Sequence, residues 1–130
     1  MKFSILSDPS NLKISRQHIK NYIQKNKLNT LDELNVVLAI DESVQNIIRH
    51  AYHMDNAKVI DFDLTHKELD FTVLIRDYGT QVSLEKIKSR DLKDIKPGGL
   101  GVHFIKSICK KVDYKHVVDT KGGTLLTLVF

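Results

Sequence analysis

Four polar side chains recur at helical spacing in and just beyond the segment VVLAIDESVQNIIRHAY, residues 36–52. At 100° per residue, Glu42, Asn46, Arg49 and His53 fall within about 60° of one another, opposite an apolar stripe. A carboxylate at Glu42 can accept a proton from an attacking hydroxyl or water, and the Asn46 carboxamide offers a hard oxygen ligand for Mg²⁺. The same pattern is typical of the solvated face of a surface helix, so the stripe alone leaves both interpretations open.

An acid and a glycine follow the next apolar segment, in IRDYGT, residues 75–80. Asp77 ends a β-branched run, where its carboxylate can accept a hydrogen bond from an amino group of a ligand. Gly79 permits a tight turn immediately afterwards. Asp-x-Gly is also a common turn sequence, so this motif indicates a turn as readily as a site.

Two glycine motifs lie in the last third of the chain. KPGGLGVHFIKSI, residues 96–108, runs from a glycine-rich loop into a helix, whose N-terminus and free N–H groups can bind a phosphate. It contains neither the Gly-Lys-Ser/Thr of a P-loop nor a dinucleotide fingerprint, and a linker before an ordinary helix is the alternative. In GGTLLTLVF, Thr124 can either contact a ligand or satisfy the turn.

The elements that would position these residues follow from hydrophobic spacing. KFSIL predicts a first strand, and SDPSN predicts a capped turn before a helix that runs to about Leu28. NTLDE predicts a capping box, with Thr30 as N-cap and Glu33 three residues on, at the start of the long helix that carries the polar stripe. Residues 59–64 and 71–75, on either side of a polar turn at 66–68, predict a β-hairpin.

The C-terminal part predicts one helix and two strands. That helix extends from Leu100 to about Val112, and its apolar stripe is Ile105, Ile108, Cys109 and Val112. Two strand-like runs follow around a turn at 121–123, while the charged segment 82–97 favours a connection or short helical turns. We therefore predict one α+β domain over residues 1–130, a two-layer sandwich rather than a doubly wound sheet.

Composition and charge exclude several classes of protein. The chain has 130 residues, 42% hydrophobic and 28% charged, with no apolar run near the ~20 residues of a membrane span. The net charge is +4, but acidic and basic residues are interleaved and aromatic residues are scattered, which disfavours direct nucleic-acid binding. The N-terminus is unlike a signal peptide and Cys109 is the single cysteine, so we expect a soluble protein of the reducing cytoplasm.

Taken in order, these motifs resemble the GHKL (Bergerat-type) ATP-binding fold, and this resemblance implies a mixed, mostly antiparallel sheet with helices on one face. Within that superfamily the chain is most similar to the small bacterial anti-sigma factor kinases, which phosphorylate a serine on an anti-anti-sigma partner. DESVQNIIRHAY is similar to their N box, RDYGT to their G1 box, and GGLGVHFIKSICKKVDY to their G2 box. The resemblance extends over essentially the whole chain.

The resemblance implies ATP and Mg²⁺ as cofactors and a role for each motif. Glu42 matches the family's general base, Asn46 its Mg²⁺ ligand, and Asp77 the acid that accepts from the adenine amino group. Residues 82–97 match the ATP lid, and Gly99–Gly101 the phosphate-binding turn. The implied nucleotide-binding residues are Asn46, Arg49, Asp77, Gly79, Lys96, Gly99, Leu100, Gly101, Val102 and Thr124.

The function that the resemblance implies is an ATP-binding serine/threonine-protein kinase and anti-sigma factor in transcription regulation. Its expected partners are a sigma factor and an anti-anti-sigma protein of the STAS type. We further expect a homodimer that contacts neither nucleic acid nor a membrane directly.

Two positions depart from the family's pattern. Gln81 stands where many relatives have a second glycine, two residues after Gly79. Lys96 stands near the end of the lid, where close kinase relatives often have an arginine, and a lysine lacks the guanidinium fork. These departures keep open the alternative of a nucleotide-sensing interaction module with little or no kinase activity.

Two further alternatives are less favoured. A stand-alone histidine-kinase catalytic domain would need a further helical segment for its phosphoacceptor histidine, and the expected elements leave none over. His50 and His53 lie one helical turn apart, but no third residue is spaced nearby to complete a transition-metal site.

Overall fold

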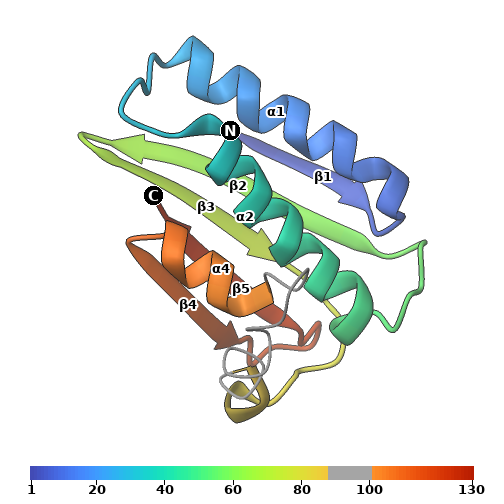
Figure 1. Ribbon diagram of the computed structural model, residues 1–130. Coiled ribbons are helices and arrows are strands. Elements are labelled where there is room, and N and C mark those ends of the chain that lie inside the picture. The colour runs from blue at the N-terminus through green and yellow to red at the C-terminus, as the bar shows by residue number, and fades with distance from the viewer. Residues whose placement is uncertain (88–100) are drawn as a thin grey trace.

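A sheet with helices packed on one of its faces makes up the part of the chain that the computed structural model describes, residues 1–87 and 101–130 (Figure 1). The strands are β1 (Lys2–Leu6), β2 (Val59–Lys67), β3 (Asp70–Arg76), β4 (Lys111–His116) and β5 (Thr124–Val129). The helices are α1 (Leu12–Lys25), α2 (Glu33–Asn46) and α4 (Gly101–Ile108), with a 3₁₀ turn at Pro9–Asn11 and a π-helical turn at Ile47–Ala51.

The strand order of the described sheet is β1-β2-β3-β5-β4, and every pairing in it is antiparallel. This arrangement confirms the predicted α+β class with helices on one face, although the described sheet is antiparallel throughout rather than mixed. The β2–β3 hairpin is confirmed, with Lys67 opposite Asp70 and a left-handed φ of 56° at Glu68. Because β5 pairs between β3 and β4, the end of β3 lies beside the start of β5.

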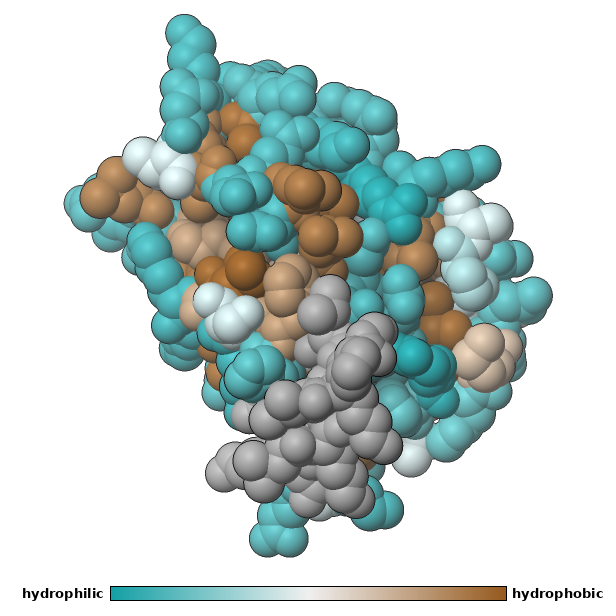
Figure 2. All heavy atoms as spheres, viewed as in Figure 1, coloured by the Kyte–Doolittle hydropathy of each residue, from teal (hydrophilic) through white to brown (hydrophobic). Residues whose placement is uncertain are grey.

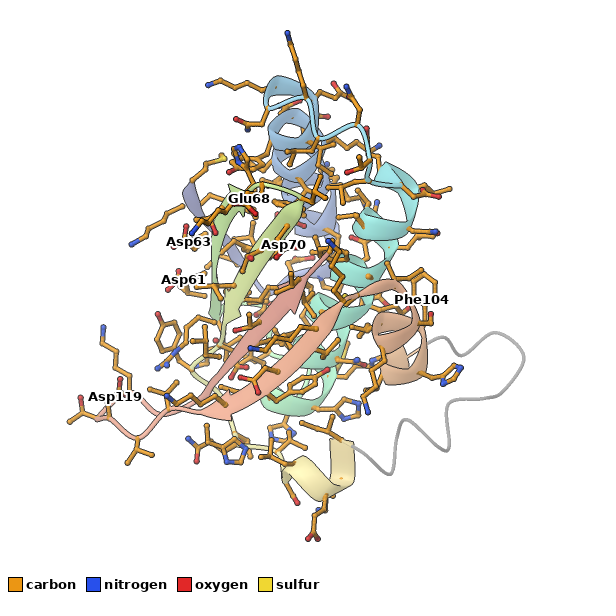
Figure 3. All side chains as sticks on the ribbon, turned by 90° about the vertical axis from the view of Figure 1, so that its left-hand side faces the viewer. Asp61, Asp63, Glu68, Asp70, Phe104 and Asp119 are labelled. Carbon is orange, nitrogen blue, oxygen red and sulfur yellow. The ribbon has the colours of Figure 1, made fainter. Side chains whose placement is uncertain are left out.

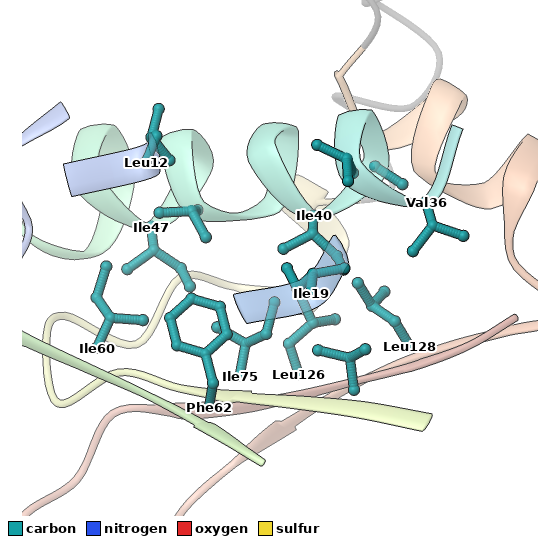
Figure 4. Close-up of a cluster of buried hydrophobic side chains, with 14 of the residues drawn as sticks. Leu12, Ile19, Val36, Ile40, Ile47, Ile60, Phe62, Ile75, Leu126 and Leu128 are labelled. Carbon is teal, nitrogen blue, oxygen red and sulfur yellow. The ribbon is translucent and has the colours of Figure 1, made fainter. Parts of the chain in front are cut away.

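The hydrophobic core lies between the sheet and the helices. Along β3, Phe71, Val73 and Ile75 alternate with less buried residues, and each is at most 1% exposed. Figure 4 shows Ile40 on the apolar side of α2, and Ile47 of the π-helical turn, packed above residues of the sheet. Each such side chain contributes about 1.5–3 kcal/mol when fully buried, which fixes the rotation of α2 and therefore the direction of its polar face.

The two faces of the sheet differ in polarity. Asp61 and Asp63 alternate with buried Phe62 along β2, and Figure 3 shows both acids on the side of the sheet away from Phe104 of α4. On the helix-covered side, Figure 2 shows mostly hydrophilic side chains around a group of hydrophobic ones. Leu34 and Leu38 are exposed apolar side chains of α2. No helix within the described residues combines the length and hydropathy needed to cross a bilayer.

The N-terminus of α2 differs from the predicted capping box. Asp32, not Thr30, is the N-cap: its backbone is extended, and its carboxylate accepts from the Asn35 N–H at 3.2 Å. The helix begins at Glu33, so Thr30 lies outside the first turn. An ionised side chain at the cap also interacts favourably with the helix dipole.

Two predicted helix ends are also corrected. The first helix ends at Lys25 rather than near Leu28, where the chain turns through a left-handed φ of 52° at Lys27. The last helix ends at Ile108, and Val112 instead lies in β4 opposite Leu128. Strand pairing therefore prevails over the helical spacing at Val112.

Cys109 is half-buried against the core, and burial raises the pKa of its thiol to about 12.

Candidate functional site

The polar face of α2 is the first part of the candidate site. Glu42 and Asn46 lie one turn apart on α2, and both are half-buried. Arg49 follows in the π-helical turn, where its Nη2 donates to Asn46 Oδ1 at 3.2 Å. His53 does not continue the stripe, because it lies beyond the helix with φ 50° and its Nε2 is 3.0 Å from Thr80 Oγ1.

The π-helical turn brings the end of the helix against the turn after β3. Its last carbonyl, Ala51 O, accepts from the Thr80 N–H at 2.9 Å. Gly79 lies directly on this carbonyl, and a Cβ added there would be 2.4 Å from Ala51 O. The glycine predicted to form a turn is thus required for a close backbone approach. Turns of this π type are frequent at functional sites.

Asp77 lies at the end of β3 and faces the helices. It continues the alternation of Phe71, Val73 and Ile75, and it is 4% exposed. Its Oδ1 accepts from the Gly79 N–H at 3.0 Å. Burial raises the pKa of the Asp77 carboxyl, while backbone hydrogen bonds of Gly79 and Thr124 and the charges of nearby basic residues oppose that rise.

Thr124 lies opposite Asp77 on the neighbouring strand. The register that pairs Arg76 with Leu125 places them side by side, and the Asp77 N–H donates to Thr124 O at 3.0 Å. His116 is opposite Thr124 on β4, so three polar side chains cross the sheet in a row on its helix-covered face. This row joins two residues from distant motifs and adds one that the sequence did not single out.

Tyr52 connects the end of the helix to the Asp77 turn. It is 6% exposed, and its hydroxyl accepts from the Tyr78 N–H at 2.8 Å and donates to the Val59 carbonyl. Burial is the main cause that raises the pKa of this hydroxyl to about 12. The phenol therefore stays protonated and keeps both hydrogen bonds at neutral pH.

Removing the Tyr52 hydroxyl should destabilise the fold measurably. We expect Tyr52→Phe to lower the free energy of unfolding in urea by about 1–3 kcal/mol, because a partly buried N–H and a carbonyl lose their partner. Tyr22→Phe is the control, since that hydroxyl makes an exposed hydrogen bond to His66 Nδ1 at 2.7 Å. Equal losses in the two variants would contradict the connecting role of Tyr52.

The predicted phosphate-binding turn is described only in part. Gly101 and Val102 open α4, both are buried, and α4 packs against α2. Figure 1 shows this end of α4 on the same side of the molecule as the C-terminal half of α2 and the end of β3. Lys96, Gly99 and Leu100, like most of the predicted lid, lie outside the described residues.

Comparison with known proteins identifies the family. The sequence matches the histidine kinase-like ATPase domain over residues 5–130. The chain belongs to this family. The family match confirms the predicted GHKL-type fold and its resemblance to anti-sigma factor kinases.

Two relatives show how far the likeness extends. Serine-protein kinase RsbW of Halalkalibacterium halodurans is 24% identical over 95 residues, which are 66% of this chain and 57% of that protein. The crystal structure of the RsbU and RsbW domains of Rv1364c from Mycobacterium tuberculosis aligns with a TM-score of 0.65 at 17% identity, over 99% of this chain and 30% of that one. The chain thus matches little more than half the length of the kinase, and the structural likeness concerns the fold.

Two of the described residues carry groups of the kind that would hold a nucleotide with Mg²⁺. The buried carboxylate of Asp77 is suited to accept a hydrogen bond from an amino group. Because Gly79 has no Cβ, the backbone of Ala51 can pack directly against the turn after Asp77. Asn46 offers an amide oxygen, a ligand type that Mg²⁺ prefers. ATP use is expected of this family.

Sequence reasoning missed an ion pair, next to the candidate site, between a buried aspartate and a half-exposed arginine. Asp41 precedes Glu42 and is 6% exposed; its Oδ2 accepts from Arg16 Nε of α1 at 2.7 Å. Its Oδ1 has no hydrogen-bond partner among the described residues, and burial raises its pKa. The signal was present, since Asp41 shares the buried helical face of Val37 and Val44 and a charge there requires a cation.

Proposed function

We propose that the chain is an ATP-dependent protein serine/threonine kinase that also acts as an anti-sigma factor. One observation carries this proposal. Glu42 and Asn46 share one face of α2, and the turn that follows the helix packs on Gly79, two residues after buried Asp77. Adjoining elements therefore provide a proton acceptor, a hard oxygen ligand for Mg²⁺ and a hydrogen-bond acceptor for the adenine base.

Each residue then has a role in the proposed reaction. Asp77 and Thr124 bind the adenine end of ATP, and Gly79 keeps the turn beneath the base narrow. Glu42 accepts the proton of the partner's serine hydroxyl as the serine oxygen attacks the γ-phosphorus, the bond from that phosphorus to the β,γ-bridging oxygen breaks, and ADP leaves. Asn46 is the protein ligand of Mg²⁺, which supplies charge neutralisation on the phosphates when bound. Gly101 and the N-terminus of α4 hold the phosphates.

This division of work suits phosphoryl transfer. Such reactions need little covalent chemistry from the protein, and positioning and charge stabilisation provide most of the rate. Lys96, Gly99, Leu100 and Val102 complete the proposed nucleotide-binding set, and Arg49 keeps the Asn46 amide oriented through their hydrogen bond.

The proposed partners follow from the kinase class. A sigma factor would be bound and held, and an anti-anti-sigma protein of the STAS type would be the serine substrate, in a cytoplasmic circuit of a homodimeric protein. The curated relative named a serine-protein kinase supports the substrate type. A second candidate function is a nucleotide-sensing interaction module without transfer, which the departures at Gln81 and Lys96 favour.

A phosphotransfer assay tests the proposal. The purified chain is incubated with an anti-anti-sigma protein and ATP with Mg²⁺, and the partner's mass is followed by mass spectrometry. The proposal predicts a partner that gains one phosphate on a serine. A stable complex without any phosphate on the partner would instead favour the nucleotide-sensing module.

A further inference from the structure

We infer that Gln81 is a positioning residue for nucleotide binding: its side-chain amide clamps the β4–β5 turn, residues 117–123, against the Asp77 turn. The inference rests on the proposed function, because it assigns a task in ATP binding. It concerns a position where the sequence departs from the glycine that many relatives have.

Two hydrogen bonds define the clamp. Gln81 Nε2 donates to Val117 O and to Gly123 O, each at 3.0 Å. Gly123 O also accepts from the Val117 N–H at 3.0 Å, so the two ends of the β4–β5 turn are hydrogen-bonded to each other where the Gln81 amide contacts them. One side chain thus contacts both ends of this turn.

The clamped residue lies directly on the Asp77 turn. A Cβ added to Gly123 would be 2.1 Å from Asp77 O and 2.6 Å from the Cα of Tyr78. The next residue, Thr124, accepts the Asp77 N–H through its carbonyl at 3.0 Å. A shift of Gly123 therefore changes the spacing between Thr124 and Asp77, the two residues proposed to contact the base.

Neighbouring contacts hold the same turn from other sides. His116 Nε2 lies 2.7 Å from Val82 O, and because a carbonyl only accepts, that nitrogen carries the proton. On the outer side, Arg76 Nη2 donates to Gly122 O at 2.6 Å. Within the turn, the Asp119 carboxylate accepts from the Gly122 N–H at 2.9 Å. Gln81 therefore acts beside His116, and it is the Gln81 amide that contacts Val117 and Gly123 at the two ends of the turn.

The chemistry of the clamp makes an isosteric test possible. Both partners of Gln81 are carbonyl oxygens, so only the NH₂ end of the amide can face them. In Gln81→Glu the shape is kept, but a carboxylate oxygen faces two carbonyl oxygens and repels them. Gln81→Ala only removes the two hydrogen bonds. We therefore expect Gln81→Glu to weaken ATP binding more than Gln81→Ala does. Loss of side-chain packing alone would not produce this order.

Calorimetric titration with ATP and Mg²⁺ tests the clamp. We expect the Kd for ATP to rise about tenfold in Gln81→Glu and about threefold in Gln81→Ala. In phosphotransfer, the KM for ATP should rise and kcat at saturating ATP should stay within about twofold, because Gln81 touches no reacting atom. Glu68→Gln, the reverse exchange on an exposed side chain of the β2–β3 turn, should leave the Kd unchanged.

The outcomes separate this inference from the proposed function. A wild-type chain that is folded but binds no ATP overturns both. A wild type that binds ATP, with Gln81→Glu and Gln81→Ala within twofold of it, overturns the clamp and leaves the proposed function standing. Should Gln81→Glu fail to fold, Gln81→Ala decides: a Kd equal to that of the wild type overturns the inference.

Discussion

Glu42→Gln is expected to slow transfer of phosphate to a partner serine by about 10²–10⁴-fold, the usual contribution of a general base. The amide keeps the size of the side chain but cannot accept the hydroxyl proton. Glu42 is half-buried on α2 and points away from the core, so we expect the fold and the ATP affinity to change little. Single-turnover transfer to an anti-anti-sigma protein measures the rate.

The matched control is Glu33→Gln, which makes the same change on the same helix in the first turn. Its transfer rate should stay within about twofold of the wild type. A Glu42→Gln protein that transfers phosphate as fast as this control would remove Glu42 from the proposed mechanism, even if the protein proves to be a kinase.

Gly123→Ala is expected to lower the free energy of unfolding by about 4 kcal/mol, as a sum of strain and overlap. Gly123 has a φ of 78°, which disfavours any side chain, and an added Cβ would be 2.1 Å from Asp77 O. The backbone of the Asp77 turn must then move. Urea denaturation followed by circular dichroism measures the loss, and ATP binding should fall with it.

Gly122→Ala separates strain from overlap. Gly122 has a similar φ of 64°, but no atom lies within 4 Å of an added Cβ. Only the conformational penalty applies, so we expect a loss of about 1 kcal/mol. Equal losses in the two variants would show that the close contact between Gly123 and the Asp77 turn does not exist in solution.

Much of the fold could be predicted because local patterns and tertiary packing agree. The alternation along β2 and β3 and the polar turn between them predict the hairpin that the structure contains. The exceptions are positions where a competing contact decides. Val112 has helical spacing but pairs with Leu128 in the sheet, and Asp32 takes the capping role because α2 starts three residues after Thr30.

The sequence predicts the motifs of the candidate site but not how those motifs are placed relative to one another in the fold. Asp77 and Thr124 come from separate motifs, and their adjacency depends on β5 pairing with β3, which spacing along the chain does not specify. In the sequence, Gln81 stands out only as a departure from a family pattern. Its two hydrogen bonds to the β4–β5 turn depend on the same strand order. Side-chain contacts between distant segments can be predicted only once the order of the strands in the sheet is known.

The central claim is that the polar face of α2 forms part of an ATP site. Calorimetric titration of the folded chain with ATP, with and without Mg²⁺ and alongside Asn46→Ala, tests it most directly. The account predicts binding to the wild type that strengthens with Mg²⁺ and loses that dependence in Asn46→Ala, because the amide oxygen is the proposed ligand. Absence of ATP binding to a wild-type protein shown to be folded would contradict it, and Glu42 and Asn46 would then be ordinary residues of a solvated helix face.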